Sequence, residues 1–95
     1  MIKYLEKEND FDEIIKGHVL VDFYADWCGP CKRLMTILEE INEIDILKVN
    51  VDMFPDIAKR YGIMSIPTLI LFENSSEAKK EIGFKTKDEI IEMIK

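Results

Sequence analysis

Two cysteines, Cys28 and Cys31, stand in the segment Trp27-Cys28-Gly29-Pro30-Cys31-Lys32, and the chain contains no others. An apolar, strand-like run over 18–25 precedes the segment, and a helical pattern with apolar residues at i, i+3, i+4 and i+7 follows it. The pair therefore stands where a strand turns into a helix, and the free N–H groups and dipole of a helix start favour a thiolate there. Cys31, one turn further on, can reach back to Cys28. This spacing predicts thiol–disulfide exchange, with Cys28 as the nucleophile and Cys31 as the resolving thiol.

The residues around the cysteines suit an exposed reactive turn. Pro30 fits the first helical turn, because its missing N–H would have no helical partner. Gly29 allows a close approach of another backbone and leaves the Cys28 sulfur open. Trp27 offers a flat apolar contact surface beside the dithiol, although a plain core tryptophan is the simpler interpretation.

Asp22 and Lys48 are polar residues within apolar runs. Asp22 interrupts the run over 18–25, which we expect to be covered on both faces. Burial of a carboxylate is costly and raises its pKa, so Asp22 could accept the proton of Cys31 near neutral pH. Lys48 interrupts the strand predicted over 46–51 and is the expected charge neighbour. The alternatives are a solvated strand edge for Asp22 and an ammonium that extends out to water for Lys48.

The hexapeptide, the preceding run over 21–26 and the later Ile66-Pro67-Thr68 together resemble the thioredoxin family. The resemblance covers nearly the whole chain, in the family's order. It implies an α/β thioredoxin fold, a mixed five-stranded central sheet flanked by four helices. It also implies a protein-disulfide reductase that carries electrons on the Cys28–Cys31 disulfide, needs no further cofactor and is re-reduced by a thioredoxin reductase. The clients would be disulfide-containing proteins.

The same resemblance assigns roles near the later proline. In thioredoxins this proline, here Pro67, follows a cis bond and faces the dithiol. The preceding residue, Ile66, pairs its backbone with the substrate as an added strand, and Gly83 lies on the same docking surface. The chain also departs from the family pattern: Tyr24 replaces a frequent tryptophan, and bulky Phe84 follows Gly83. Thr36 replaces a frequent proline, and the hairpin turn 74–76 lacks the usual glycine.

Length and composition set the remaining expectations. The chain has 95 residues, 47% of them hydrophobic, and a net charge of −6. One domain over 1–95 and a monomer are expected, with neither nucleic acid nor a membrane as partner. The first residues lack the apolar core of a signal peptide, which favours the cytoplasm.

Periodicity and turn residues predict a βαβαβα order followed by ββα, and hence a sheet with both parallel and antiparallel strands. Thr86 and Glu89 have the spacing of a capping box ahead of the last helix. The expected strands are 2–5, 18–25, 46–51, 67–72 and a polar strand that ends at Gly83. The first expected helix starts near Asn9 or Asp10 and ends at Gly17, and the other three run over 28–43, over 55–61 and from 87 to the end.

Three other functions compete with disulfide reduction. Structural zinc needs four ligands, whereas the chain offers two cysteines and the distant His18, so no metal is expected. An oxidant or isomerase on the same fold is the rival within the enzyme class, and Gly29-Pro30 favours the reductant. A non-catalytic binding module with an incidental dithiol is the rival from another class, and an unperturbed Cys28 thiol would support it.

Overall fold

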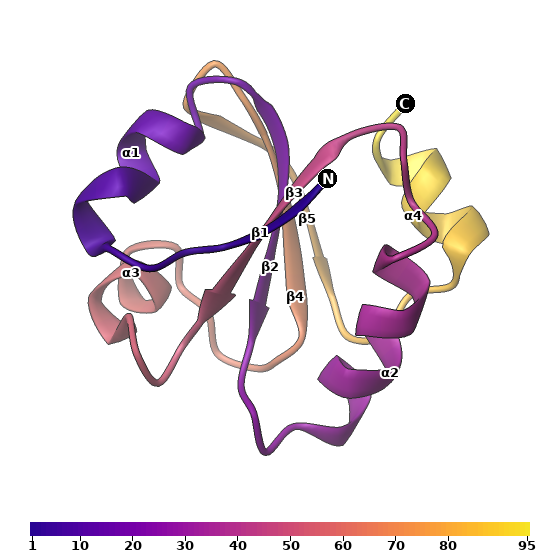
Figure 1. Ribbon diagram of the computed structural model, residues 1–95, viewed down its shortest axis with the longest axis horizontal. Coiled ribbons are helices and arrows are strands. Elements are labelled where there is room, and N and C mark those ends of the chain that lie inside the picture. Colours follow the sequence, from indigo (N-terminus) through magenta and orange to yellow (C-terminus); the bar gives the residue numbers. More distant parts are fainter.

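The computed structural model describes residues 1–95, which form five strands and four α-helices as predicted (Figure 1). The strands lie in the order β1-β3-β2-β4-β5. β1, β3 and β2 run parallel, whereas β4 and β5 are antiparallel to their neighbours. The elements are β1 (Ile2–Tyr4), a 3-10 turn (Glu8–Asp10), α1 (Phe11–Ile14), β2 (His18–Tyr24), α2 (Gly29–Leu38), β3 (Asp45–Asn50), α3 (Pro55–Arg60), β4 (Thr68–Glu73), β5 (Ser76–Ile82) and α4 (Lys87–Met93).

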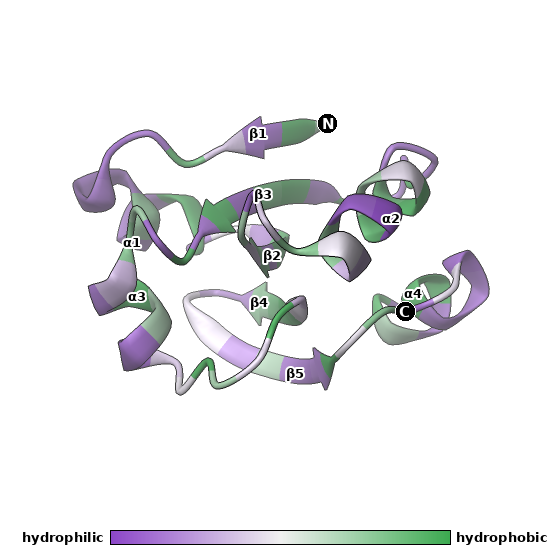
Figure 2. Ribbon diagram, turned by 90° about the horizontal axis from the view of Figure 1, so that it is seen from below, coloured by the Kyte–Doolittle hydropathy of each residue, from purple (hydrophilic) through white to green (hydrophobic).

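The sheet separates two apolar cores. α1 and α3 cover one face, and α2 and α4 cover the other (Figure 2). Successive side chains of β2 point to opposite faces, so Val21 and Phe23 pack with α1 and α3, whereas Leu20 packs with α2 and α4. Asp22 alternates with Val21 and Phe23 and therefore faces α2. The apolar character of β2 on both faces, predicted from the sequence, follows from its central place in the sheet.

The residues predicted to begin α3 and α4 and to end α3 do so in the structure. Thr86 and Glu89 form the predicted capping box at α4, each side chain accepting a hydrogen bond from the other residue's backbone N–H. Pro55 opens α3, and Gly62, which follows it, has φ +64°. The hairpin turn between β4 and β5 forms without glycine, because Asn74 and Ser75 both adopt the left-handed backbone conformation, at φ 52° and 71°. This is the twist that a two-residue hairpin turn requires.

Two predicted helix ends are wrong. The helix expected over 28–43 ends at Leu38. Ile41 and Ile44 continue the apolar pattern, but they are buried from the loop, where short-range hydrogen bonds such as Ile41 N–H to the Leu38 carbonyl turn the chain toward β3. α1 ends at Ile14, and Gly17 is not in the left-handed conformation expected of a helix-ending glycine. The predicted strand limits agree to within one or two residues.

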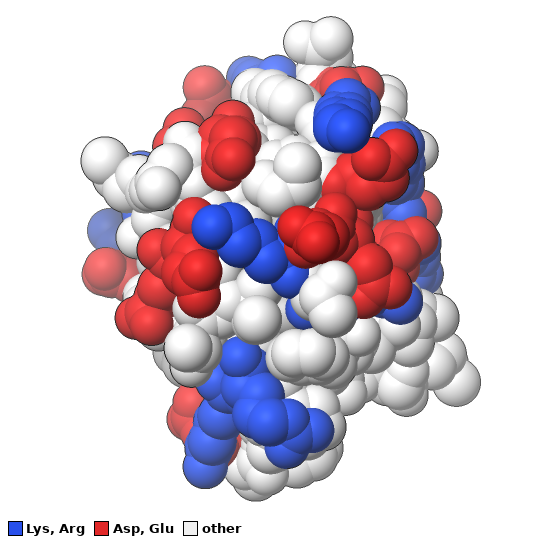
Figure 3. Space-filling view, turned by 90° about the vertical axis from the view of Figure 1, so that its right-hand side faces the viewer, with Lys and Arg blue, Asp and Glu red and all other residues white.

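None of the helices is long and apolar enough to cross a membrane. Acidic and basic side chains are interspersed over the face that carries α2 and α4, and basic side chains gather at its lower end (Figure 3). Lys32 and Arg33 are both exposed in the first turns of α2.

Candidate active site

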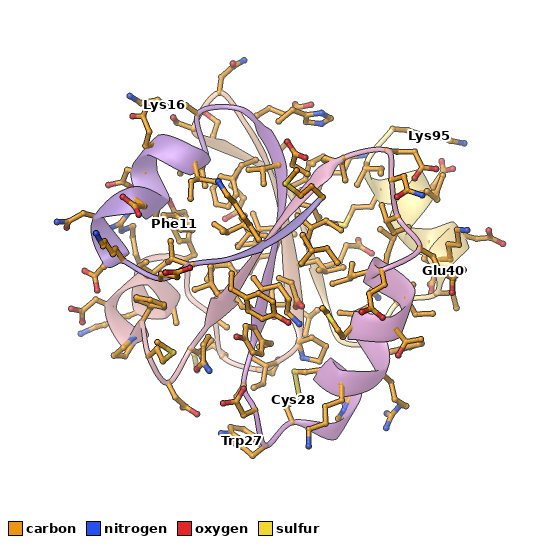
Figure 4. All side chains as sticks on the ribbon, viewed as in Figure 1. Phe11, Lys16, Trp27, Cys28, Glu40 and Lys95 are labelled. Atoms are coloured by element: carbon orange, nitrogen blue, oxygen red, sulfur yellow. A yellow bond between two sulfur atoms is a disulfide. The ribbon has the colours of Figure 1, made fainter.

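The dithiol lies between the end of the central strand β2 and the first turns of α2. Cys28 is the N-cap residue of α2, and its Sγ accepts a hydrogen bond of 3.2 Å from the backbone N–H of Cys31. Pro30 occupies the first turn, as predicted. Cys28 and Cys31 form a disulfide with 5.2 Å between their Cα atoms. Trp27 and Cys28 lie together at one end of the molecule, beyond the end of β2 (Figure 4).

Exposure does not separate the two sulfurs in the way that the sequence suggested. Trp27, Gly29 and Pro30 are exposed. However, Cys28 is only 4% exposed and Cys31 2% exposed, so the expectation of an open Cys28 sulfur is wrong for this disulfide form. The two cysteines differ in position instead. Cys28 caps the helix, with its Sγ 3.9 Å from the Ile66 carbonyl oxygen, whereas Cys31 lies inside the helix.

A loop that carries Ile66 and Pro67 faces the dithiol. The Ile66–Pro67 peptide bond is cis, which confirms the expectation drawn from the resemblance. The backbone N–H of Gly83 donates a 2.8 Å hydrogen bond to the Pro67 carbonyl, which places Gly83 beside this loop. Gly83 has φ +91°, a backbone conformation that favours glycine. An open, mainly apolar groove of about 340 Å³ borders this side of the site, lined by Trp27, Val51, Ile63, Met64, Ser65 and Ile66.

Asp22 and Lys48 form a buried ion pair beneath α2. The two residues are direct neighbours in the register of β2 and β3, and Lys48 Nζ lies 3.3 Å from Asp22 Oδ2. The predicted pairing is confirmed, and the alternatives of a solvated aspartate and an outward lysine are excluded, since their side chains are 0% and 4% exposed. Neither Asp22 oxygen accepts a well-oriented hydrogen bond. Burial raises the pKa of Asp22 to about 6, against the opposing effect of the Lys48 charge.

Comparison with known proteins agrees with this geometry. The family model for thioredoxin matches residues 1–95. The chain belongs to the thioredoxin family. It is 45% identical to a thioredoxin of Chlamydia trachomatis, over 99% of this chain and 96% of that relative. It is 44% identical to a thioredoxin of Staphylococcus epidermidis, over 92% of this chain and 89% of that relative. The structure resembles that of a thioredoxin variant from Halobacterium salinarum with a TM-score of 0.90 at 32% identity, covering 98% of this chain and 87% of the other.

Family membership and the Cys28–Cys31 disulfide together establish the activity. This thioredoxin is a thiol–disulfide oxidoreductase that reduces disulfides in proteins. The predicted site residues Trp27, Gly29 and Pro30 flank the two cysteines in the chain, and Ile66 and Pro67 lie on the loop that faces the disulfide. Gly83 is hydrogen-bonded to Pro67, and Asp22 and Lys48 lie beneath α2. His18 does not join them, because it pairs with Glu73 at the other end of β2.

The sequence patterns did not point to Asp52, which holds Trp27, or to Asn50, which holds the loop that carries Asp52. The Trp27 indole Nε1–H donates a 2.9 Å hydrogen bond to Oδ2 of Asp52. Asn50, buried at the end of β3, accepts hydrogen bonds from the backbone N–H groups of Asp52 and Met53 through its side-chain oxygen. The parallel pairing of β2 and β3 brings their carboxyl ends to one edge of the sheet. The polar residues at the end of the predicted strand 46–51 were therefore the available signal.

Proposed function

We propose that Cys28 attacks the disulfide of a client protein and that Cys31 then resolves the mixed disulfide. In the first step a new bond forms between Cys28 and one client sulfur, and the other client sulfur leaves as a thiolate and takes up a proton. In the second step Cys31 gives its proton to the Asp22 carboxylate and attacks Cys28. The bond between Cys28 and the client breaks, and the departing client sulfur takes up a second proton, so that the client leaves as a dithiol. The client gains two electrons, and the protein is left with the Cys28–Cys31 disulfide.

The position of the Cys28 sulfur carries this assignment. It lies at the N-cap of α2, where it accepts the Cys31 N–H hydrogen bond, and the helix start favours a negative sulfur. Cys28 is also the cysteine beside Ile66, and Ile66 borders the open groove. Cys31 is one turn inside the helix and lines a separate pocket with Lys48. A client that docks at the groove therefore meets Cys28 first.

The client docks in this proposal as an extended segment beside Ile66. Ile66 makes no backbone–backbone hydrogen bond within the protein, so its N–H and C=O can pair with a client strand. Trp27, Gly29, Pro30, Pro67 and Gly83 would surround that segment. Main-chain pairing gives little selectivity for the client's sequence, which suits a general reductant.

The electrons are proposed to come from a separate thioredoxin reductase, with no cofactor in this chain other than the disulfide. We further propose that the protein acts as a monomer in the cytoplasm. Family membership supports these proposals.

The test is reduction of a model protein disulfide with catalytic amounts of this protein, a bacterial thioredoxin reductase and its electron donor. The expected result is turnover by the wild type and none by Cys28→Ser. Turnover by Cys28→Ser, or none by the wild type under any reductase, would refute the proposal. A reduction potential separates reductant from oxidant: the proposal requires about −270 mV, whereas about −180 to −120 mV would indicate an isomerase or oxidant.

A further inference from the structure

The Lys48 ammonium is held by an unusual set of neighbours. Besides Asp22 Oδ2, its Nζ lies 3.3 Å from the sulfur of Met35 and 4.3 Å from the centre of the Tyr24 ring. The ring of Tyr4 is more distant, at 5.8 Å. Of these neighbours only Asp22 carries charge. The ammonium is therefore kept in place by one carboxylate, one thioether and the face of an aromatic ring.

The topology brings Tyr24 to this place. Tyr24 follows Asp22 by two residues on β2, so both side chains point to the face covered by α2. Tyr4, Lys48 and Asp22 stand side by side across β1, β3 and β2. The Tyr4 ring meets the Tyr24 ring edge to face, with 6.2 Å between centres. Tyr24 is thus held from β1 and lies over the Lys48 ammonium.

The strength of the Asp22–Lys48 attraction depends on where the ammonium sits. A lysine ammonium ends a flexible stem and is strongly hydrated. A pocket of about 190 Å³ lies beside it, lined by Tyr4, Tyr24, Ala25, Asp26, Cys31, Lys32, Met35 and Lys48. If the Tyr24 ring were absent, the ammonium could move into this pocket and away from the carboxylate. The attraction between the ammonium and the carboxylate falls with the distance between them. No hydrogen-bond donor contacts the Asp22 carboxylate to compensate for a more distant ammonium.

We propose that Tyr24 is a positioning residue for the resolving step: its ring face holds the Lys48 ammonium against the Asp22 carboxylate that accepts the Cys31 proton. This inference rests on the proposed function. An aromatic ring face attracts an ammonium within about 6 Å of its centre, and the 4.3 Å separation between Lys48 Nζ and the Tyr24 ring lies inside that range. Met35 contacts the ammonium from α2, one turn after Cys31, and completes its surroundings.

Several other groups act on the same site. Asp26 follows β2, and Lys32 and Cys31 reach the pocket from α2. On the β4 side Asp22 has the apolar Leu69 as its neighbour. Burial raises the pKa of the Tyr24 phenol, and the Asp26 charge acts in the same direction, so the ring stays neutral at physiological pH. The ring therefore acts through its face and not as a titrating group.

The test follows the titration of the Asp22 carboxyl carbon by NMR in the oxidised protein, with Asp22→Asn to assign the signal. Tyr24→Leu is expected to raise the midpoint by about half a pH unit or more, the size expected from loss of one cation–π contact. Tyr24→Phe is expected to restore the wild-type midpoint, and Tyr24→Trp to match or lower it. An unchanged midpoint in Tyr24→Leu would overturn the proposal. If that variant does not fold, a midpoint in Tyr24→Trp above the wild type would overturn it.

A double-variant comparison separates positioning of Lys48 from a general structural effect. In a Lys48→Met background, Tyr24→Leu is expected to leave the Asp22 midpoint unchanged, because no ammonium remains to be positioned. An equal shift in both backgrounds would overturn the proposal. Tyr61→Leu is the control, since Tyr61 packs on the other face of the sheet. A shift as large in this control as in Tyr24→Leu would also count against Tyr24.

The kinetic readout is the rate at which the mixed disulfide is resolved. Tyr24→Leu is expected to slow this step about twofold at pH 6 and about threefold at pH 5 and below, with the difference fading above pH 7 as Asp22 ionises in both proteins. The NMR titration requires no turnover. Failure of the proposed function would therefore abolish reduction and leave the midpoint shift intact, whereas failure of this inference would remove the shift and leave reduction intact.

Discussion

The Asp22 carboxylate and the Lys48 ammonium meet at 3.3 Å between neighbouring strands, under the helix that carries the dithiol. Water is excluded from both groups. Burial raises the pKa of Asp22 more than the Lys48 charge lowers it, so that the pKa rises to about 6. A carboxyl group with such a pKa changes its protonation close to neutral pH. It is therefore suited to receive the proton of a nearby thiol.

Asp22→Asn should alter stability in a pH-dependent way. The folded pKa of about 6 lies above the ordinary value of 3.8. The wild type therefore has the full stability contribution of Asp22 below pH 3.8 and loses it as pH rises through about 6. Asparagine does not titrate. The advantage of Asp22→Asn in free energy of unfolding should grow by about 2 kcal/mol between about pH 4 and about pH 7.5. Denaturant titrations of the oxidised proteins measure this, and a constant or shrinking difference would contradict the buried carboxylate.

The same substitution should slow one chemical step and spare the other. Without the Asp22 carboxylate Cys31 lacks its proton acceptor, so decay of the mixed disulfide should slow at least about tenfold near pH 7. Formation of the mixed disulfide by Cys28 should change little. Single-turnover kinetics with a chromophoric peptide disulfide resolve the two phases. Slowing of the first phase alone would assign Asp22 to Cys28 activation instead.

Trp27 and Asp52 should act as one unit in client docking. Either Trp27→Phe or Asp52→Ala removes the 2.9 Å hydrogen bond that orients the indole. Each should lower the second-order rate of mixed-disulfide formation severalfold, and the double variant should be no slower than the slower single one. Loss of stability should stay within about 1 kcal/mol, because the bond is exposed. Glu77→Ala, which removes an exposed carboxylate from β5 that makes no ion pair, is the control, and an equal effect there would point to charge alone.

Two glycines at the site should respond to alanine in opposite ways. Gly83 has φ +91°, and a methyl group added at its Cα would meet only open space, so Gly83→Ala should lose about 1–2 kcal/mol from backbone strain alone. Gly29 begins α2, and the nearest atom to an added Cβ is Arg33 Nη1 at 3.9 Å. Gly29→Ala should therefore keep or raise stability, by about 0.5 kcal/mol, while it slows attack by Cys28. Thermal unfolding and single-turnover rates distinguish these cases. Fast attack by a stable Gly29→Ala would remove Gly29 from the docking surface.

Much of the fold could be predicted from local sequence patterns. The alternation of strands and helices, the capping box at Thr86 and the helix start at Pro55 depend on neighbouring residues, and the structure confirms them. The end of α2 could not be predicted in this way. Ile41 and Ile44 keep the helical period, and only the packed core decides that they are buried from a loop.

In the candidate site, too, some features could be predicted from the sequence and others depend on the packed structure. The dithiol and the pairing of Asp22 with Lys48 followed from spacing and from the cost of a buried charge. The cis bond before Pro67 came from family resemblance, since the residues alone favour trans. The hydrogen bond between Trp27 and Asp52 joins residues 25 positions apart and depends on the loop after β3. Exposure of Cys28 was overestimated, because the sequence does not reveal how closely the Ile66 loop covers the sulfur.

The division of labour between the two cysteines is tested most directly by mass spectrometry of trapped mixed disulfides. Reduced Cys31→Ser and Cys28→Ser are each mixed with a peptide disulfide, quenched with acid and mapped. Cys31→Ser is expected to accumulate one adduct, on Cys28, and Cys28→Ser is expected to accumulate little or none. Accumulation of the adduct on Cys31 in Cys28→Ser, with none in Cys31→Ser, would show that Cys31 is the attacking thiol and Cys28 is not.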